Sequence, residues 1–224
     1  MKRNVNLSEI SDGRLYGSND MVKADCHGCK GCSDCCRGMG KSVILDPYDI
    51  FRLEVGLGKG IEALMAAGMV ELNVVDGCIL PNLKMSGQSE ECVYLDGQGR
   101  CSIHEFRPGI CRLFPLGRYY EDGDFKYFLQ IRECSVKDRS KVKVSKWVDT
   151  PQMQKNHDFV CKWHYLLNDV EAIVGSCEND DLTKRVNMIL LKLFYITLYD
   201  VDKDFYQQFD LRYDCFKETL KEIH

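Results

Sequence analysis

Five of the 13 cysteines lie within eleven positions, in the stretch CHGCKGCSDCCRG that spans residues 26–38. Two residues between successive cysteines let both sulfur atoms face the same side of a turn, and thiolate ligands must converge to about 2.3 Å from a zinc ion. Gly28 and Gly31 let the backbone bend there without the steric cost of a Cβ atom. The residue types and their spacing therefore indicate a metal-binding loop.

Four cysteines farther along the chain fit the role of additional ligands. Cys92 and Cys101 begin the two arms of an expected hairpin, Cys111 lies in a short helical turn, and Cys134 ends the next hairpin. Hairpins and tight turns are rigid platforms that can return distant thiolates to one place. The odd number of cysteines and the adjacent pair in the first cluster disfavour a disulfide framework, and we expect metal or redox chemistry instead.

The segment CKGCSDCC (29–36) has the form CxxCxxCC, and CVYLDGQGRCSIHEFRPGICRLFP (92–115) and Glu133–Cys134 follow it. Together these segments resemble the CxxCxxCC family, described as a zinc- or iron-chelating domain, to which the bacterial flagellin lysine-N-methylases are similar. The resemblance covers residues 26–134. Carried over residue by residue, it implies eight metal ligands, namely Cys29, Cys32, Cys35, Cys36, Cys92, Cys101, Cys111 and Cys134.

Two cysteines outside that set are further candidates. Cys26 stands in front of the family motif, and Cys78 is either a ninth ligand or a core cysteine. The three remaining cysteines fall at apolar helical positions and read as core residues. These are Cys161, Cys177 and Cys215.

Three polar residues around Cys111 are candidates for tuning the metal. Arg107 and Arg112 flank Cys111, and His104 stands where the family usually has tyrosine. Such groups can bind an anion or offset the negative charge of a thiolate cluster. The competing interpretation is a surface salt bridge or a helix cap for the arginines and a hydrogen-bonded structural role for His104.

The metal is either iron or zinc. The CxxCxxC triplet occurs in bacterial ferredoxins, which favours an iron–sulfur cluster of the 4Fe-4S type, but zinc accepts the same thiolates. In one interpretation both sites are closed and the metal only stabilises the fold, so the chain is a non-enzymatic zinc-binding structural or interaction module. In the other, an open iron position binds S-adenosylmethionine or a substrate.

The resemblance names one reaction for an open cluster, which is methyl transfer to a protein lysine. An iron–sulfur-dependent methyltransferase acting on a protein substrate is therefore one enzyme hypothesis, and an oxidoreductase is another. The Gly-rich strand-to-helix turn of an ordinary nucleotide-binding fold is missing from the sequence. The leading function is a cysteine-ligated metal-binding protein that carries an iron–sulfur cluster.

The elements that must position the cysteines are short. Asp46 and Pro47 predict the start of a helix over 44–58. Asp76–Gly77 predicts a hairpin turn within 70–83, and similar patterns predict hairpins over 92–104 and 117–131. The fold class is therefore α+β, a small cysteine-rich module of hairpins and helices followed by a helical C-terminal region.

Helical spacing begins near Thr150. We expect an N-terminal extension (1–25), a metal-binding domain (26–148) and a helical C-terminal region (149–224). The segment 180–200 is apolar almost all round, so it is either buried centrally or forms the interface of a homodimer.

Composition narrows the class of protein. Hydrophobic residues make up 45% of the 224 residues and charged residues 29%, which is typical of a globular chain. The net charge of −4 disfavours a nucleic-acid partner, and the basic run DRSKVKVSK (138–146) reads as a solvated strand or loop. No stretch reaches the roughly 18 apolar residues of a membrane span, and no signal sequence is evident. We therefore expect a cytoplasmic protein without a membrane partner.

Overall fold

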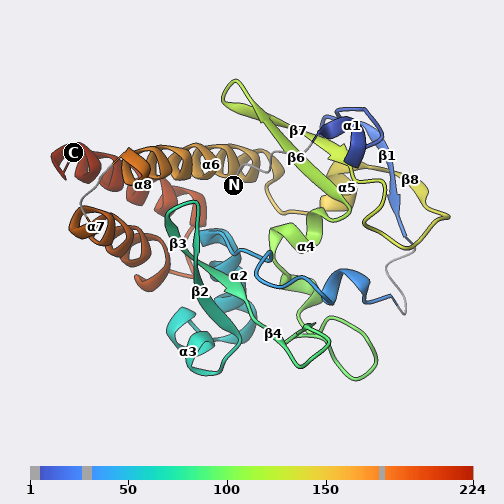
Figure 1. Cartoon of the computed structure of the whole chain (residues 1–224), viewed down its shortest axis with the longest axis horizontal. Coiled ribbons are helices and arrows are strands. Elements are labelled where there is room, and N and C mark those ends of the chain that lie inside the picture. Colours follow the sequence, from blue (N-terminus) through green and yellow to red (C-terminus); the bar gives the residue numbers. More distant parts are fainter. Residues whose placement is uncertain (1–5, 27–31, 177–179, 224) are drawn as a thin grey trace. The chain divides into compact units, whose positions relative to one another are not determined.

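The computed structural model describes residues 6–26, 32–176 and 180–223. These residues contain both helices and small antiparallel strand pairs, which confirms the predicted α+β class (Figure 1). The chain divides into two compact units that each combine distant parts of the sequence. Of the described residues, 44–84, 158–176 and 180–223 form what we call the helical unit, and 6–26, 32–43 and 85–157 form the cysteine-rich unit.

The cysteine-rich unit consists of short elements joined by loops. Its helices and helical turns are α1 (Leu7–Ile10), η2 (Asp34–Cys36), η3 (His104–Phe106), α4 (Gly109–Leu113) and α5 (Val144–Val148). Its strands are β1 (Met21–Asp25), β4 (Met85–Ser86), β5 (Glu91–Cys92), β6 (Leu116–Glu121), β7 (Asp124–Leu129) and β8 (Ser140–Lys143).

The longest strand pairing in this unit is the predicted hairpin over 117–131. Strands β6 and β7 pair from Leu116↔Leu129 to Glu121↔Asp124. Asp122 and Gly123 form the turn at φ values of 50° and 80°, the left-handed region that a two-residue hairpin turn of this type requires. The hairpin prediction is therefore confirmed. The sequence could predict it because the turn residues Asp122 and Gly123 themselves favour this conformation.

A second pairing joins segments far apart in the sequence. Strand β1 pairs antiparallel with β8, with Met21 opposite Lys143 and Asp25 opposite Ser140. Figure 1 shows these two strands side by side, one near each end of the unit's sequence. The basic run at 138–146 thus contributes a strand and the start of helix α5.

The predicted hairpin over 92–104 forms only in its central part. Strand β5 pairs with β4 instead, and only Leu95 and Cys101 form a bridge within the expected hairpin. The side chain of Asp96 accepts hydrogen bonds from the backbone N–H groups of Gln98 and Arg100, at 2.9 Å and 2.8 Å. These local bonds shape the turn, and the backbone pairing beside it is short: Asp96 N–H donates to the Arg100 carbonyl and Ser102 N–H to the Tyr94 carbonyl, each at 2.8 Å.

The helical unit surrounds an aromatic core. Its elements are α2 (Pro47–Leu57), α3 (Ile61–Ala66), β2 (Val70–Val75), β3 (Cys78–Leu83), most of α6 (Met153–Ser176), α7 (Asp180–Leu191), the π-helical turn η4 (Lys192–Ile196) and α8 (Phe205–Ile223). Phe159 and Trp163 of α6 pack against Phe194 and Phe209. Helices α6 and α8 lie along one another (Figure 1), joined by the ion pairs Lys162–Asp210 and Lys217–Asp169.

Local signals in this unit behave as expected. Asp46 caps α2 and forms a reciprocal capping box with Asp49, and Pro47 is the first helical residue. Strands β2 and β3 pair through the Asp76–Gly77 turn, with Val75 opposite Cys78. Both elements confirm the sequence prediction.

The predicted helix over 180–200 is shorter and more amphipathic than expected. Helix α7 ends at Leu191, and η4 and a loop follow it. Val186 and Leu190 are buried, whereas Met188 is 70% exposed, so α7 is not apolar all round. No helix in the described residues combines the length and apolarity needed to cross a membrane.

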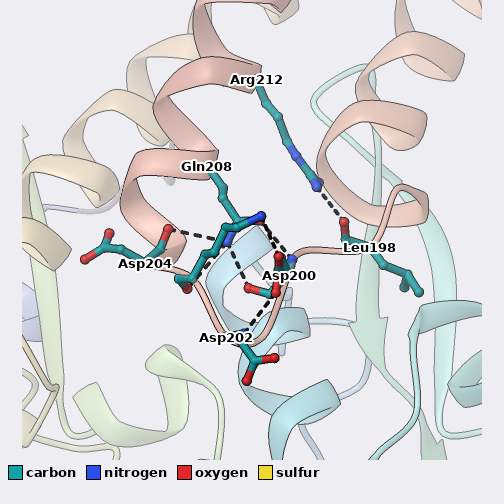
Figure 2. Close-up of polar contacts among 7 residues, drawn as sticks. Leu198, Asp200, Asp202, Asp204, Gln208 and Arg212 are labelled. Atoms are coloured by element: carbon teal, nitrogen blue, oxygen red, sulfur yellow. Dashed lines mark hydrogen bonds and ion pairs between the residues drawn. The ribbon is translucent and has the colours of Figure 1, made fainter.

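The loop between η4 and α8 is held by side chains of α8 (Figure 2). Gln208 accepts a hydrogen bond from the Asp200 backbone N–H at 2.8 Å and donates one to the Asp200 carbonyl at 3.0 Å. Arg212 donates to the carbonyls of Thr197 and Leu198, at 2.6 Å and 2.7 Å. These bonds satisfy carbonyl groups that the end of the π-helical turn leaves unpaired.

Candidate metal centre

Most of the predicted ligands lie in the short elements of the cysteine-rich unit. Cys35 and Cys36 belong to η2, Cys92 to β5, and Cys111 to α4. Cys29 lies outside the described residues. Seven of the eight predicted ligands are therefore placed, and all seven are half-buried.

Four of these thiols form what we call the first cysteine group, namely Cys35, Cys36, Cys92 and Cys101. Cys35 and Cys36 are linked by a side-chain hydrogen bond, which is the largest of the causes that raise the pKa of Cys35. Burial raises the pKa of both Cys92 and Cys101, and the nearby Cys35 raises each further. The fold thus brings Cys35 and Cys36 close to Cys92 and Cys101.

Backbone contacts hold the two parts of this group in register. Arg37 pairs with Glu91 through an antiparallel bridge and a salt bridge between their side chains. The Gly38 N–H donates to the Glu90 carbonyl at 3.0 Å. Cys36 and Cys92 are the immediate neighbours of Arg37 and Glu91, so this bridge sets the distance between the two segments.

Arg107 is the cation of the first cysteine group. Its charge lowers the pKa of both Cys35 and Cys101, against the larger effect of burial. Its Nε is buried and has no hydrogen-bond partner among the described residues, and one of its other nitrogens contacts the His104 ring. Burial and the Arg107 charge lower the pKa of His104. An unpaired cationic nitrogen beside thiols fits a site that takes up negative charge.

Arg112 has a structural function. It is only 6% exposed, and its guanidinium donates to the carbonyls of Arg107 at 3.1 Å, of Asp149 at 2.8 Å and of Glu105. These bonds tie η3 and α4 to the end of α5. Arg112 therefore positions the segment that carries Arg107, and a direct contact of Arg112 with an anion stays a prediction.

Three other thiols form what we call the second cysteine group, namely Cys26, Cys32 and Cys134. Burial raises the pKa of Cys134, and Cys26 and Cys32 lie near enough to raise it further. The Cys32 sulfur lies 3.9 Å from the Ser135 hydroxyl. Cys26, which precedes the family motif, thus lies near Cys32 and Cys134, which belong to it.

The remaining cysteines have other surroundings. Cys78 starts β3 in the helical unit and is buried, and its pKa is raised to about 11, chiefly by that burial. Cys215 is exposed on α8, and Cys161 is half-buried on α6. Cys177 lies outside the described residues. The surroundings of Cys78 resemble those of an ordinary core thiol.

One cation that acts on a predicted ligand was not singled out from the sequence. Arg139 lies beside Cys134 and lowers its pKa, and the Nη1 of Arg139 is buried without a hydrogen-bond partner in the described part of the chain. The only sequence signal was its place in the basic run at 138–146, which was interpreted as solvated. The charges in a sequence segment do not reveal which of its cations acts on a thiol from another part of the chain.

The donor set fits a thiophilic metal. Thiolates are the preferred ligands of zinc and of iron–sulfur clusters, and both cysteine groups contain at least three. Among the described cysteines, no three sulfur atoms all lie within 4.8 Å of one another.

Comparison with known proteins gives one match. No curated protein and no solved structure matches the chain. The model of the CxxCxxCC family, described as "Putative zinc- or iron-chelating domain", matches residues 28–143, which is more than half of the chain and includes every cysteine of the first group. This description supports metal binding through cysteines. The chain belongs to the CxxCxxCC family.

Proposed function

We propose that the protein binds an iron–sulfur cluster through the first cysteine group. Four thiols from two parts of the sequence gather there beside the unpaired Arg107 nitrogen. The negative charge of a thiolate-ligated cluster would be offset by this cation, which is a common way for surrounding groups to tune a cluster. Metal binding is the function that this chemistry supports best.

The separation of the sulfur atoms favours a cluster over zinc. A single tetrahedral zinc ion holds its thiolate sulfurs about 3.8 Å apart, as Zn–S bonds of about 2.3 Å require. In a 4Fe-4S cluster each thiolate binds its own iron atom, so the sulfurs stay farther apart. No three of the described sulfurs lie within 4.8 Å of one another, which agrees better with the second arrangement.

Anaerobic purification tests the metal. We expect a brown protein with visible charge-transfer absorption and at least about four iron and four sulfide ions per chain. Cys35→Ser should lose this absorption, because it removes a thiol of the first cysteine group. Cys215→Ser, which changes an exposed thiol on α8, should keep it. A colourless protein with about two zinc ions and no iron would contradict the proposal and support a zinc-binding module.

For the chemistry of the cluster we propose methyl transfer from S-adenosylmethionine to a protein lysine. The support is the sequence resemblance to the flagellin lysine-N-methylases. Adding S-adenosylmethionine to the anaerobic protein should change the visible spectrum, because the cofactor would bind an open iron position. An unchanged spectrum would favour a closed, non-enzymatic centre.

A further inference from the structure

The β1–β8 pairing brings together two chain segments that end in cysteines. Cys26 directly follows β1 and is 6% exposed. Cys134 precedes β8 by a short loop. At the end of the ladder Asp25 lies opposite Ser140, and the Ser140 hydroxyl donates to the Asp25 carboxylate at 3.0 Å. Residues more than a hundred positions apart therefore meet at this edge.

Cys32 also contacts the loop between Cys134 and β8. The Cys32 sulfur is 3.9 Å from the Ser135 hydroxyl, so Cys32 lies against the residue that follows Cys134. Both Cys26 and Cys32 act electrostatically on Cys134. The interactions of Cys92 and Cys101, in contrast, are with Cys35 and with each other. These interactions place Cys26 and Cys32 near Cys134, and Cys92 and Cys101 near Cys35.

Arg139 occupies the position in the second cysteine group that Arg107 occupies in the first. Its charge acts on the Cys134 thiol, and its Nη1 is buried without a hydrogen-bond partner among the described residues. An unsatisfied buried cationic nitrogen is costly unless a negative charge offsets it. Metal-bound thiolates would supply that charge. The buried Nη1 of Arg139 therefore supports a bound metal independently of the grouping of the thiols.

We propose that Cys26, Cys32 and Cys134 are ligands of a second metal centre, separate from the first cysteine group, with Arg139 as its charge partner. The centre would take a thiophilic metal such as zinc or iron, because its described donors are thiols. Cys26 lies outside the family motif and outside the matched range, which starts at residue 28. The inference rests on the proposed function only in requiring that the chain binds metal.

Thiol protection in the full-length protein tests this division. Metal-bound thiolates react slowly with N-ethylmaleimide, and the modified cysteines are identified by peptide mass spectrometry. In Cys26→Ser, we expect Cys32 and Cys134 to react at rates approaching that of exposed Cys215. Cys92 and Cys101 should keep the slow rates of the wild type, because their own group is intact.

The reciprocal variant is the matched control. In Cys35→Ser, Cys92 and Cys101 should become reactive and Cys134 should stay protected. A rise in the reactivity of Cys32, Cys92, Cys101 and Cys134 in both variants would show one shared centre and overturn the proposal. An unchanged rate at Cys32 and Cys134 in Cys26→Ser would show that Cys26 is not a ligand.

Two further variants guard against misfolding and test the cation. If circular dichroism shows that Cys26→Ser is unfolded, Cys134→Ser replaces it, with Cys26 and Cys32 as the thiols expected to become reactive. Arg139→Gln should raise the reactivity of Cys134, whereas Arg132→Gln, on the exposed part of the same loop, should not. Equal effects of these two substitutions would exclude the charge-partner function.

The readout separates this inference from the proposed function. Thiol protection does not depend on which metal is bound. A zinc-only protein would therefore contradict the iron–sulfur proposal, and the division into two groups would still be measured. A wild-type protein in which every described thiol reacts at the rate of Cys215 would contradict both.

Discussion

Two arginines near the first cysteine group differ in what they contact. Arg107 has a buried nitrogen without a hydrogen-bond partner among the described residues, and it lies beside two thiols. Arg112 is bonded to three backbone carbonyls. Both arginines flank Cys111, so the sequence alone predicts the same function for each. Their different surroundings separate a residue suited to charge compensation from one that holds the backbone.

Arg112→Lys tests the structural function. Lysine keeps the charge but lacks the planar fork that reaches several carbonyls at once. We expect a loss of about 1–3 kcal/mol in the free energy of unfolding, since buried carbonyls would lose their donors. Denaturant unfolding of the metal-loaded protein measures this. Arg100→Lys, on an exposed turn, should unfold like the wild type, and equal midpoints for both variants would contradict the assignment.

At the scale of elements, the β2–β3 hairpin depends on one side chain from α7. Asn187 is 2% exposed, accepts a hydrogen bond from the Ile79 N–H at 2.6 Å and donates to the Gly77 carbonyl at 3.0 Å. The amide thus bonds to the turn residue Gly77 and to the second residue of β3. This contact connects a local turn to a helix more than a hundred residues later.

Asn187→Ala should therefore destabilise the helical unit. The variant leaves the Ile79 N–H without its partner, and we expect a cost of about 1–3 kcal/mol. Met188→Ala, next to it on the exposed face of α7, should change stability by less than about 0.5 kcal/mol. Thermal or denaturant unfolding distinguishes them, and a neutral Asn187→Ala would show that the hairpin holds its turn unaided.

The elements show what the sequence could predict. The hairpins at 70–83 and 117–131 and the capped start of α2 follow from residues within the element, and all three predictions were confirmed. The hairpin expected over 92–104 is shorter than predicted, because Cys92 pairs in β5 with β4 and only the part around the Leu95–Cys101 bridge pairs with itself. The helix expected over 180–200 continues as a π-helical turn after Leu191 and was wrong only beyond Ile196, where the chain leaves the helical conformation.

The candidate site could be predicted only in part. The spacing of the cysteines and the family resemblance point to the ligand types. The division of these thiols into two groups depends on the β1–β8 ladder and on the Arg37–Glu91 bridge. Such long-range pairings leave no local pattern, so neither the grouping nor the position of Arg139 could be read from the sequence.

At the scale of the molecule, the two units differ in what stabilises them. The helical unit has an aromatic core that includes fully buried Phe194, Phe209 and Phe216. The strand pairs of the cysteine-rich unit are two-stranded, and isolated pairs of this kind are only marginally stable in water. Bound metal can supply folding free energy on the order of 10 kcal/mol in small cysteine-rich domains.

Metal removal should therefore affect the two units unequally. After chelation under reducing conditions, we expect amide hydrogen exchange to accelerate in the described segments 85–143, whereas α7 and α8 should keep their protection. Hydrogen-exchange mass spectrometry of the full chain, with and without chelator, gives the comparison. A uniform acceleration over both units, or none in either, would contradict a local stabilising function of the metal.

The discontinuous make-up of the cysteine-rich unit has a consequence for its synthesis. Cys32 and Cys134 lie about a hundred residues apart, and translation at roughly 5–20 residues per second separates their appearance by about 5–20 s. A similar time passes between the synthesis of β1 and that of β8, and the ladder cannot form before β8 is made. The early thiols thus leave the ribosome long before their late partners, in a nascent chain exposed to oxidation and to competing metals.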